Sequence, residues 1–229
     1  MKTAVITGGS GAIGSALVEE FSIDHRVIFT YLKNKKKAEE IAGKYGAEAV
    51  CCDITVEDDV KKLCAVTNRC DILINNAGIS STGLFTDMSY SALRDIVDTD
   101  FFGAMLVTKT FLPLMISCKN GCIINVSSIW GIHGASCEVA YSAAKAGMIG
   151  FTKALARETG PSGVRVNCIA PGLIESEMNA HLSADELEEF VSGTSLSRIG
   201  KSFDVAQAAR YLSQAGFVTG QVLVVDGGF

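Results

Sequence analysis

The sequence predicts an α/β protein: a doubly wound parallel sheet of seven strands, covered by helices on both faces, in a single domain. The first observation is that short, continuous apolar runs alternate along the chain with segments of helical period. Strands that are apolar throughout are typical of a parallel sheet buried between two layers of helices. The second observation is that glycine-rich or polar clusters follow most of these runs. In such a sheet they meet beyond the carboxyl ends of the strands, where ligands bind.

Each element follows from its own local pattern. Apolar, β-rich runs predict strands at residues 3–7, 26–30, 49–52, 71–74, 122–126, 164–169 and 221–225. Apolar residues spaced by three and four predict helices at residues 12–22, 35–45, 57–66, 89–117, 139–159 and 203–215. The helix after Val56 should carry Val60, Leu63 and Val66 on its apolar face. Pro113 should kink or restart the long fourth helix, because proline has no N–H.

Composition narrows the class of protein. The chain has 229 residues, 48% of them hydrophobic, and a net charge of −5. This negative charge argues against a general nucleic-acid binder. No apolar run approaches the ~18 residues of a membrane span, so we expect no membrane association. The first strand starts at Thr3 and leaves no room for a signal peptide. We therefore expect a cytoplasmic protein.

The eight cysteines do not form a metal-binding pattern. No C-x-x-C pair occurs, and there are only three histidines. Several cysteines lie inside apolar runs, where the side chain behaves as a small hydrophobe. We therefore expect reduced thiols and no metal site.

Residues 127–145 carry the candidate chemistry. Tyr141 and Lys145 are four residues apart in an Ala-rich segment, so both project from one helix face. An ammonium beside a phenol favours the phenolate, and such a tyrosine can exchange a proton with a carbonyl or alcohol. Ser128 follows a predicted strand, and its hydroxyl could bind the same substrate oxygen. From this stretch alone, an ordinary amphipathic helix with a surface lysine explains the pattern equally well.

The turn from Thr7 to Gly14 reads Thr-Gly-Gly-Ser-Gly-Ala-Ile-Gly and joins the first strand to the first helix. Glycines permit a tight turn and a close approach of backbone to a pyrophosphate, whose charge is favoured at a helix N-terminus. A glycine-rich turn at this place predicts a dinucleotide cofactor.

The second strand indicates which dinucleotide is used. NAD-dependent proteins usually place an acid after this strand to bind the ribose hydroxyls. Here the residues from Tyr31 to Asn34 contain no acid, and Lys33 is followed by three more lysines. Lysines can meet a 2′-phosphate as point charges, although some of them must simply face solvent. We therefore expect NADPH rather than NADH.

Together these landmarks resemble the short-chain dehydrogenase/reductase family over the whole length, which implies a Rossmann-type fold. They are Thr7–Gly14, Asp53-Ile54, Asn75-Asn76-Ala77-Gly78, Ser128, Tyr141-x-x-x-Lys145, and Pro171-Gly172-Leu173-Ile174 with Ser176. The run from Tyr141 to Glu158 resembles 3-oxoacyl-[acyl-carrier-protein] reductases. Within residues 127–145, the segments 127–131 and 134–139 resemble elongation factor P 5-aminopentanone reductases.

The resemblance implies a role for each matching residue. Tyr141 would be the general acid for hydride transfer to a ketone, Lys145 would lower its pKa and hold the nicotinamide ribose, and Ser128 would polarise the carbonyl. Asp53 and Ile54 would flank the adenine. The residues expected at the cofactor are Thr7, Gly8, Ser10, Gly11, Ile13, Gly14, Tyr31, Lys33, Asp53, Ile54, Asn75, Ala77, Gly78, Tyr141, Lys145, Pro171, Gly172, Ile174 and Ser176.

Two positions depart from the family pattern. Ala12 replaces the middle glycine of the turn, with Gly11 one residue earlier, and we expect the pyrophosphate site to persist with a slightly altered turn. Asp100 stands where the family usually has an Asn that holds a proton-relay water, and we count it among the catalytic residues. Its charge should stabilise Lys145 as an ammonium, but it cannot donate a hydrogen bond as an amide does.

The substrate should be defined by the loop before Tyr141 and by a lid at about residues 172–200. Trp130, Cys137 and Glu138 are the substrate-contacting candidates. Glu138, Glu175, Glu177 and Asp100 suggest an acidic mouth, which would favour an aminated substrate; solvated glutamates are an equal explanation.

Two enzymatic interpretations stay open: reduction of a 3-oxoacyl thioester on acyl-carrier protein, and reduction of a ketone on a modified lysine of elongation factor P. Lys119 matches one basic docking position for a carrier protein, but Ser162 replaces a second. A third interpretation, a regulator that senses NADPH without turnover, predicts loss of Tyr141 or Lys145, and both are present. Helices 89–117 and 139–160, with the segment 220–228, resemble interfaces of a homotetramer.

Overall fold

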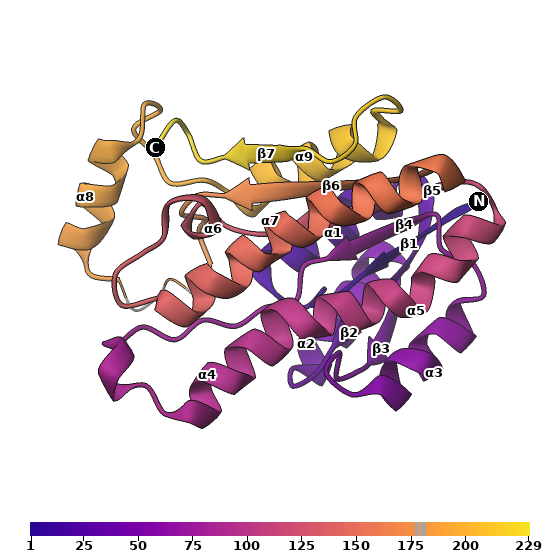
Figure 1. Ribbon diagram of the computed structural model, residues 1–229, viewed down its shortest axis with the longest axis horizontal. Coiled ribbons are helices and arrows are strands. Elements are labelled where there is room, and N and C mark those ends of the chain that lie inside the picture. Colours follow the sequence, from indigo (N-terminus) through magenta and orange to yellow (C-terminus); the bar gives the residue numbers. More distant parts are fainter. Residues whose placement is uncertain (177–178, 180–181) are drawn as a thin grey trace.

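The computed structural model describes residues 1–176, 179 and 182–229. Within them, seven strands form one fully parallel sheet in the order β3-β2-β1-β4-β5-β6-β7 (Figure 1). The strands are β1 (Lys2–Ile6), β2 (His25–Tyr31), β3 (Glu48–Cys51), β4 (Ile72–Asn75), β5 (Gly121–Val126), β6 (Val164–Pro171) and β7 (Val222–Val225). The order runs outward from the centre in both directions, which confirms the predicted doubly wound, Rossmann-type fold.

Helices cover both faces of the sheet. On one face lie α1 (Ala12–Ser22), α2 (Lys35–Tyr45) and α9 (Ser202–Gln214), which share one hydrophobic core. On the other lie α3 (Glu57–Thr67), α5 (Ala104–Ser117) and α7 (Val139–Thr159), which share a second. The shorter elements are η1 (Phe85–Asp87), α4 (Tyr90–Val97), η2 (Asp98–Gly103), α6 (Trp130–His133), η3 (Gly160–Ser162) and α8 (Ala184–Gly193).

The central strands supply both cores by strict alternation. In β1, Val5 faces the second core, whereas Ala4 and Ile6 face the first. In β4, Leu73 faces the second core, whereas Ile72 and Ile74 face the first. Successive side chains of a strand point to opposite faces, so an uninterrupted apolar run fills both layers at once.

The long fourth helix differs from the prediction. The helix continues through Pro113 to Ser117, and the irregular part is the π-helical segment η2. Pro113 is exposed, so water can reach the carbonyl that loses its helical partner. Val66 was also misplaced on the apolar face, because it is 57% exposed. By length and composition the stretch Tyr90–Ser117 could span a membrane, but several of its residues are buried in the second core.

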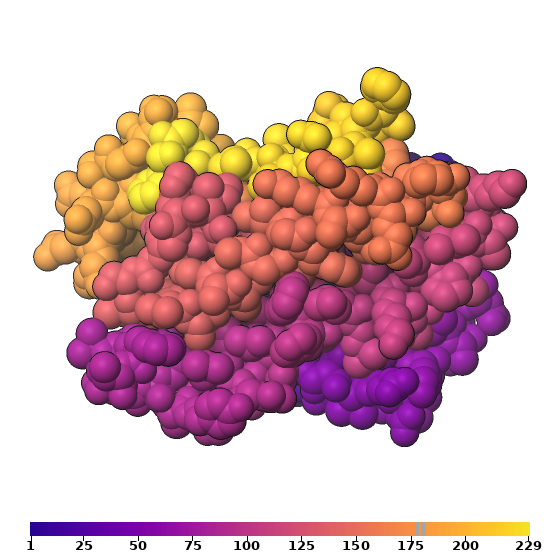
Figure 2. Space-filling view, viewed as in Figure 1, coloured from indigo at the N-terminus to yellow at the C-terminus, as the bar shows by residue number. Residues whose placement is uncertain are grey.

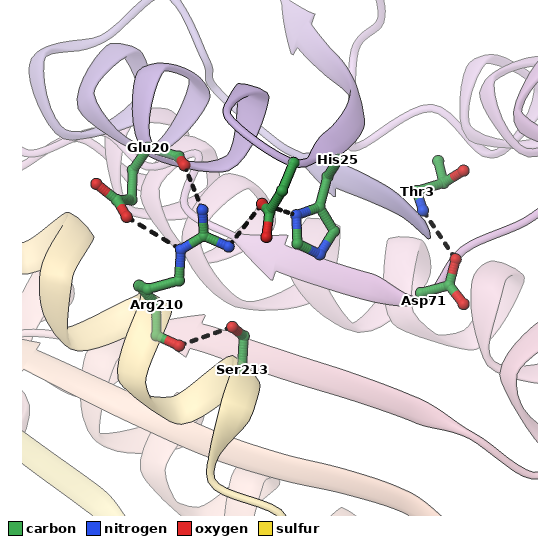
Figure 3. Close-up of polar contacts among 7 residues, drawn as sticks. Thr3, Glu20, His25, Asp71, Arg210 and Ser213 are labelled. Atoms are coloured by element: carbon green, nitrogen blue, oxygen red, sulfur yellow. Dashed lines mark hydrogen bonds and ion pairs between the residues drawn. The ribbon is translucent and has the colours of Figure 1, made fainter. Parts of the chain in front are cut away.

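Arg210 ties α9 to α1 on the first face (Figure 3). Its guanidinium donates to the Glu20 side chain at 3.0 Å, to the Glu20 carbonyl at 2.7 Å and to Asp24 at 2.8 Å. It also lies 4.9 Å from the ring centroid of Phe21. We call Arg210, Glu20, Asp24 and Phe21 the base cluster. It joins two helices that are about 190 residues apart in sequence.

Candidate active site

Two adjoining cavities lie at the carboxyl ends of the strands. The inner cavity measures about 130 Å³ and the outer cleft about 760 Å³. Both are lined by Ile13, Asn76, Gly78 and Ser176, so they form one continuous space. The polar and glycine-rich clusters noted in the sequence therefore meet in one place, as expected for a doubly wound sheet.

The glycine turn forms one wall of the outer cleft. Gly8 adopts a left-handed φ of +68°, and a Cβ there would lie 2.8 Å from the Ala77 Cα. A Cβ on Gly14 would lie 2.1 Å from the Gly8 carbonyl oxygen, so only glycine lets α1 start this close to the turn. Ser10, Gly11 and the first residues of α1, with Ala12 among them, also line the cleft. A narrow turn that leads into a helix N-terminus fits the pyrophosphate of a dinucleotide.

The far end of the outer cleft lies at the end of β2. It is lined by Tyr31, Lys33 and Lys37, with Asp53 and Ile54 from the segment after β3. Asn34 begins α2 and accepts a hydrogen bond from the backbone N–H of Lys37 at 3.1 Å. This end of the cleft carries ammonium groups at the position where an acid would bind ribose hydroxyls.

Two predicted cofactor residues do not line either cavity. Asn75 is 2% exposed, and its amide donates inside the core to Thr108 at 2.9 Å and to Asn125 at 2.8 Å. Asn76 lines the cleft instead. Thr7 is 1% exposed, and its hydroxyl oxygen accepts the N–H groups of Asn76 and Ala77 at 3.0 Å. Thr7 thus holds the loop at Asn76 and Ala77 that lines the cleft, and Asn75 anchors the start of this loop to the core.

All the other residues predicted at the cofactor line the outer cleft or the inner cavity. Gly78 and Ser176 lie at its junction with the inner cavity, and Pro171, Gly172 and Ile174 line the inner cavity. Sequence reasoning missed several residues that also line the outer cleft, namely Thr30, Leu32, Asn34, Thr55, Ile79, Asp95, Asp98 and Thr99. Asp95, Asp98 and Thr99 come from α4 and η2, and only the folded chain shows that these segments reach the cleft.

Ser128, Tyr141, Lys145 and Asp100 all line the inner cavity. The Lys145 ammonium lies 3.0 Å from Asp100 Oδ2, and donates to the Val126 carbonyl at 3.2 Å. It lies 5.4 Å from the ring centroid of Tyr141, one helical turn away on α7. The four side chains that the sequence singled out for chemistry are therefore gathered at one cavity.

Asp100 is held by its surroundings. It lies in the π-helical segment η2 and is 1% exposed. Its Oδ1 accepts the backbone N–H of Ile79 at 2.7 Å. A Cβ on Gly78 would lie 2.6 Å from Oδ2, so the absence of a side chain at Gly78 makes room for this carboxylate. Oδ2 has no aligned hydrogen-bond donor, although the Lys145 ammonium is near.

The ionisation of these groups follows from burial and from one another. Burial raises the pKa of Asp100, opposed by Lys145 and the Ile79 N–H. Burial alone would lower the pKa of Lys145, but Asp100 and Tyr141 raise it above its usual value. With a 3.0 Å separation, we assign the pair as carboxylate and ammonium at neutral pH.

The pKa of Tyr141 lies above its usual value. Burial raises it above 10.0, and Asp100 and Glu138 act in the same direction. Lys145 and the Ser128 hydroxyl act in the lowering direction but are outweighed. Lys145 therefore lowers the pKa of Tyr141 as expected, but burial outweighs it and Asp100 opposes it, so the pKa stays above its usual value. Tyr141 is a protonated phenol at neutral pH.

The substrate candidates are only partly brought together. Trp130 and Glu138 line the inner cavity, but Cys137 does not. Cys137 has a left-handed φ of +63°, and its carbonyl accepts the Gly83 N–H at 2.9 Å. The acidic mouth is also not formed as predicted, because Asp100 is buried beside Lys145 and Glu175 does not line the cavity. Glu177 lies outside the described residues.

Sequence reasoning missed one aromatic residue at the inner cavity. Phe190 of α8 lines it, together with Ser80 and Leu173. The half-buried residues Leu187, Phe190 and Val191 share one face of α8, a helical pattern visible in the sequence. The pattern alone does not show which part of the molecule this face covers.

The fold and the cleft define a dinucleotide-binding oxidoreductase, and comparison with known proteins gives its family. The family model described as enoyl-(acyl carrier protein) reductase matches residues 9–229. The uncharacterized oxidoreductase YmfI of Bacillus subtilis (strain 168) is 36% identical over 238 residues, with 100% of this chain and 98% of the relative covered. The 3-oxoacyl-[acyl-carrier-protein] reductase FabG of Chlamydia muridarum is 36% identical over 239 residues, with 99% and 96% covered.

A solved structure agrees with these relatives. The 3-oxoacyl-[acyl-carrier protein] reductase of Brucella melitensis has a TM-score of 0.93 and 32% sequence identity, with 100% of this chain and 91% of that chain covered. The chain belongs to the short-chain dehydrogenase/reductase family. It is an oxidoreductase that acts on CH–OH or C=O groups with a nicotinamide dinucleotide.

Proposed function

We propose that this protein is an NADPH-dependent ketone reductase whose substrate is a 3-oxoacyl thioester on acyl-carrier protein. The observation that carries the proposal is the placement of Tyr141 beside Ser128 and Lys145 in a cavity that opens into the outer cleft. Reduction of a ketone requires a proton donor near the carbonyl oxygen, and a buried phenol is suited to donate.

The residues that line the cleft and the inner cavity would hold a reduced nicotinamide dinucleotide, which would supply hydride to the carbonyl carbon. Tyr141 donates its hydroxyl proton to the carbonyl oxygen, and Ser128 donates a hydrogen bond to the same oxygen. Lys145 stays charged beside Asp100 and stabilises the phenolate that forms on Tyr141. Asp100 thereby influences the proton transfer through Lys145. It stands where the family usually has an Asn, whose amide carries no charge.

Two features of the cleft support NADPH. No acid occurs between Tyr31 and Asn34, and Lys33 and Lys37 line the cleft at that end. A 2′-phosphate would gain from both ammonium groups, whereas the ribose hydroxyls of NADH would find no carboxylate on the segment after β2.

The carrier-protein substrate is supported by the relatives that are named as 3-oxoacyl-[acyl-carrier-protein] reductases. The docking evidence is thinner. Lys119 is exposed just before β5, where the strands have their amino-terminal ends. The cavity lies at the carboxyl ends, so Lys119 does not border its mouth in a single copy. Ser162 offers no charge at the second expected position.

The second candidate is reduction of a ketone on a modified lysine of elongation factor P. It is favoured by the resemblance of residues 127–131 and 134–139, a segment that supplies Trp130 and Glu138 to the inner cavity. Trp130 and Glu138 would contact the substrate there and could distinguish one ketone from another.

The two candidates are separated by measuring NADPH oxidation with acetoacetyl-acyl-carrier protein and with elongation factor P carrying an aminopentanone-modified lysine. Activity with the first and none with the second supports the proposal; the reverse supports the second candidate. Tyr141→Phe should lower kcat by about 10²–10⁴-fold with either substrate, because only the proton donor is removed. Tight NADPH binding without oxidation by either ketone would instead indicate a regulator.

We also propose that the protein assembles as a homotetramer. Apolar side chains stay exposed on α4–η2, at Tyr90 and Phe102, and near β7, at Phe217 and Val224. Exposed apolar side chains at two separate places fit two interfaces between copies. Light scattering should give four times the chain mass of 24.2 kDa, and a monomer would contradict the assembly.

A further inference from the structure

Helix α8 is only lightly packed against the rest of the molecule. It begins with a capping box in which Ser183 and Glu186 each bond the other's backbone N–H. None of its described residues is fully buried, and only Leu187, Phe190 and Val191 are half-buried. A helix of ten residues with so little burial depends on a few contacts for its position.

An aromatic cluster supplies one of those contacts. The rings of Phe190 and Phe229 are stacked, with centroids 4.5 Å apart and planes 8° apart. Trp130 of α6 meets both rings edge-on, at 6.2 Å from Phe190 and 5.8 Å from Phe229. Both arrangements are favourable for aromatic pairs. The cluster therefore joins α8 to the loop before Tyr141 and to the residues after β7.

The segment after β7 is shaped to bring Phe229 there. Gly227 and Gly228 have left-handed φ values of +75° and +82°. Ser195 donates its N–H at 3.2 Å and its hydroxyl at 3.0 Å to the Gly228 carbonyl, and Leu196 donates its N–H to the Gly227 carbonyl at 3.0 Å. A Cβ on Gly228 would lie 2.7 Å from Ser195 Oγ. Figure 2 shows these yellow residues packed on the orange residues around α8.

The cluster also bounds the inner cavity. Trp130 and Phe190 line it, whereas Phe229 stands behind Phe190 and does not. The cavity volume of about 130 Å³ is small beside the ~300–1,000 Å³ typical of ligand pockets. A ketone at Tyr141 therefore has room for only a short group on the enclosed side of its carbonyl, while the rest of the substrate leaves through the mouth.

We propose that the Trp130–Phe190–Phe229 cluster holds α8 over the inner cavity and selects ketones that carry a short apolar group on one side of the carbonyl. Trp130 and Phe190 determine specificity by contact. Phe229 is a positioning residue that acts through Phe190. The substrate part of this inference rests on the proposed ketone reductase function, and the part about α8 does not.

The substrate part is tested with 3-oxoacyl thioesters whose tails grow from one carbon to five. The wild type should prefer the shortest tail. Phe190→Ala and Phe229→Ala should raise kcat/KM for the longest tail relative to the shortest by about tenfold, since one or two methylenes in an apolar pocket are worth that much. Phe229→Tyr keeps the ring and should behave as the wild type. Tyr211→Ala removes an exposed ring outside the cluster and is the matched control.

The part about α8 has a readout that needs no activity. Trp130 is the single tryptophan of the chain, so intrinsic fluorescence reports the cluster directly. Phe229→Ala should shift its emission to longer wavelength and speed hydrogen exchange across residues 184–193, whereas Tyr211→Ala should change neither. Unchanged emission and exchange in Phe229→Ala would overturn the role of the cluster.

The two failures can be told apart. An emission shift with an unchanged tail preference would overturn the specificity role. An emission shift in a protein that reduces none of the thioesters would refute the proposed function but support the positioning of α8 by Phe229.

Discussion

The base cluster and the Lys145–Asp100 pair are both partly or fully buried ion pairs, yet their surroundings differ. In the base cluster, Arg210 is 15% exposed and has three oxygen partners within 3.0 Å. In the active site, the side chains of Lys145 and Asp100 are 4% and 0% exposed, and among the described residues Asp100 Oδ2 has only the Lys145 ammonium, 3.0 Å away, as a partner. Arg210 bonds three oxygens and joins two helices, whereas Asp100 Oδ2 depends on one cation beside the reacting tyrosine.

This difference teaches what each pair contributes. A charge that is fully hydrogen-bonded contributes to stability, because no polar atom is left unpaired. A buried pair with an incomplete set of hydrogen bonds repays less of its desolvation cost. The value of Lys145–Asp100 therefore lies in its electrostatic effect on Tyr141. Burial is the main cause of the raised pKa of this phenol; within the pair, Lys145 lowers that pKa and Asp100 raises it.

The largest effect is expected from Lys145→Met. It leaves Asp100 buried without a counter-charge, which should destabilise the fold by about 3–5 kcal/mol. It also removes the group that stabilises the phenolate, so kcat should fall by about 10²–10⁴-fold. Chemical denaturation and NADPH oxidation measure the two effects.

Adding Asp100→Asn to Lys145→Met separates stability from chemistry. The double variant buries no lone charge and should recover most of the lost stability, while its activity stays low. A double variant as unstable as Lys145→Met would show that the lone carboxylate is not the cause.

Arg210→Met should have a smaller effect, and only on stability. It removes hydrogen bonds between charged groups and the contact with Phe21, at an expected cost of about 1–3 kcal/mol. Because Arg210 lies away from the described residues that line the inner cavity, kcat and KM should stay within about twofold of the wild type when folded protein is assayed. A large fall in kcat would contradict the conclusion that Arg210 contributes to stability and Lys145–Asp100 to catalysis.

The smallest effect is expected from Arg26→Met. Arg26 pairs with Glu48 between β2 and β3 at 2.7 Å, but the two side chains are 37% and 54% exposed. Exposed pairs contribute about 0.2–1 kcal/mol because solvent screens them. This variant is the control for replacing an arginine. If it lost as much unfolding free energy as Arg210→Met, burial and hydrogen bonding would not explain the larger contribution expected from Arg210.

The sequence predicted the fold well because apolar periodicity dictates it. All seven strands lie within two residues of their predicted bounds, and α1, α2 and α7 match theirs. The sequence did not reveal the π-helical segment that carries Asp100, since its local pattern is that of an ordinary helix. It also could not separate Asn75 from Asn76, because which of two adjacent side chains faces the cleft depends on where β4 ends.

The candidate site was predicted less evenly. Ser128, Tyr141, Lys145 and Asp100 were found because the family resemblance assigns a role to each position, and the structure places them at one cavity. Phe190 and Phe229 were not found, since an aromatic residue on an exposed helix and one after the last strand carry no signal of their own. Their meeting with Trp130 depends on the path of the chain through Gly227 and Gly228.

The most direct test of the account is the pH dependence of kcat for ketone reduction in Asp100→Asn. In the wild type, burial and Asp100 raise the pKa of Tyr141, so the phenol stays protonated and reduction should hold until the pH passes 10.0. Without the carboxylate, Asp100 no longer raises the pKa of Tyr141, so in the pH range where Lys145 is still an ammonium the loss of activity should begin at lower pH, with little change in NADPH affinity. A high-pH limb that is unchanged, or displaced to higher pH, would contradict the claim that Asp100 adds to the raised pKa of Tyr141.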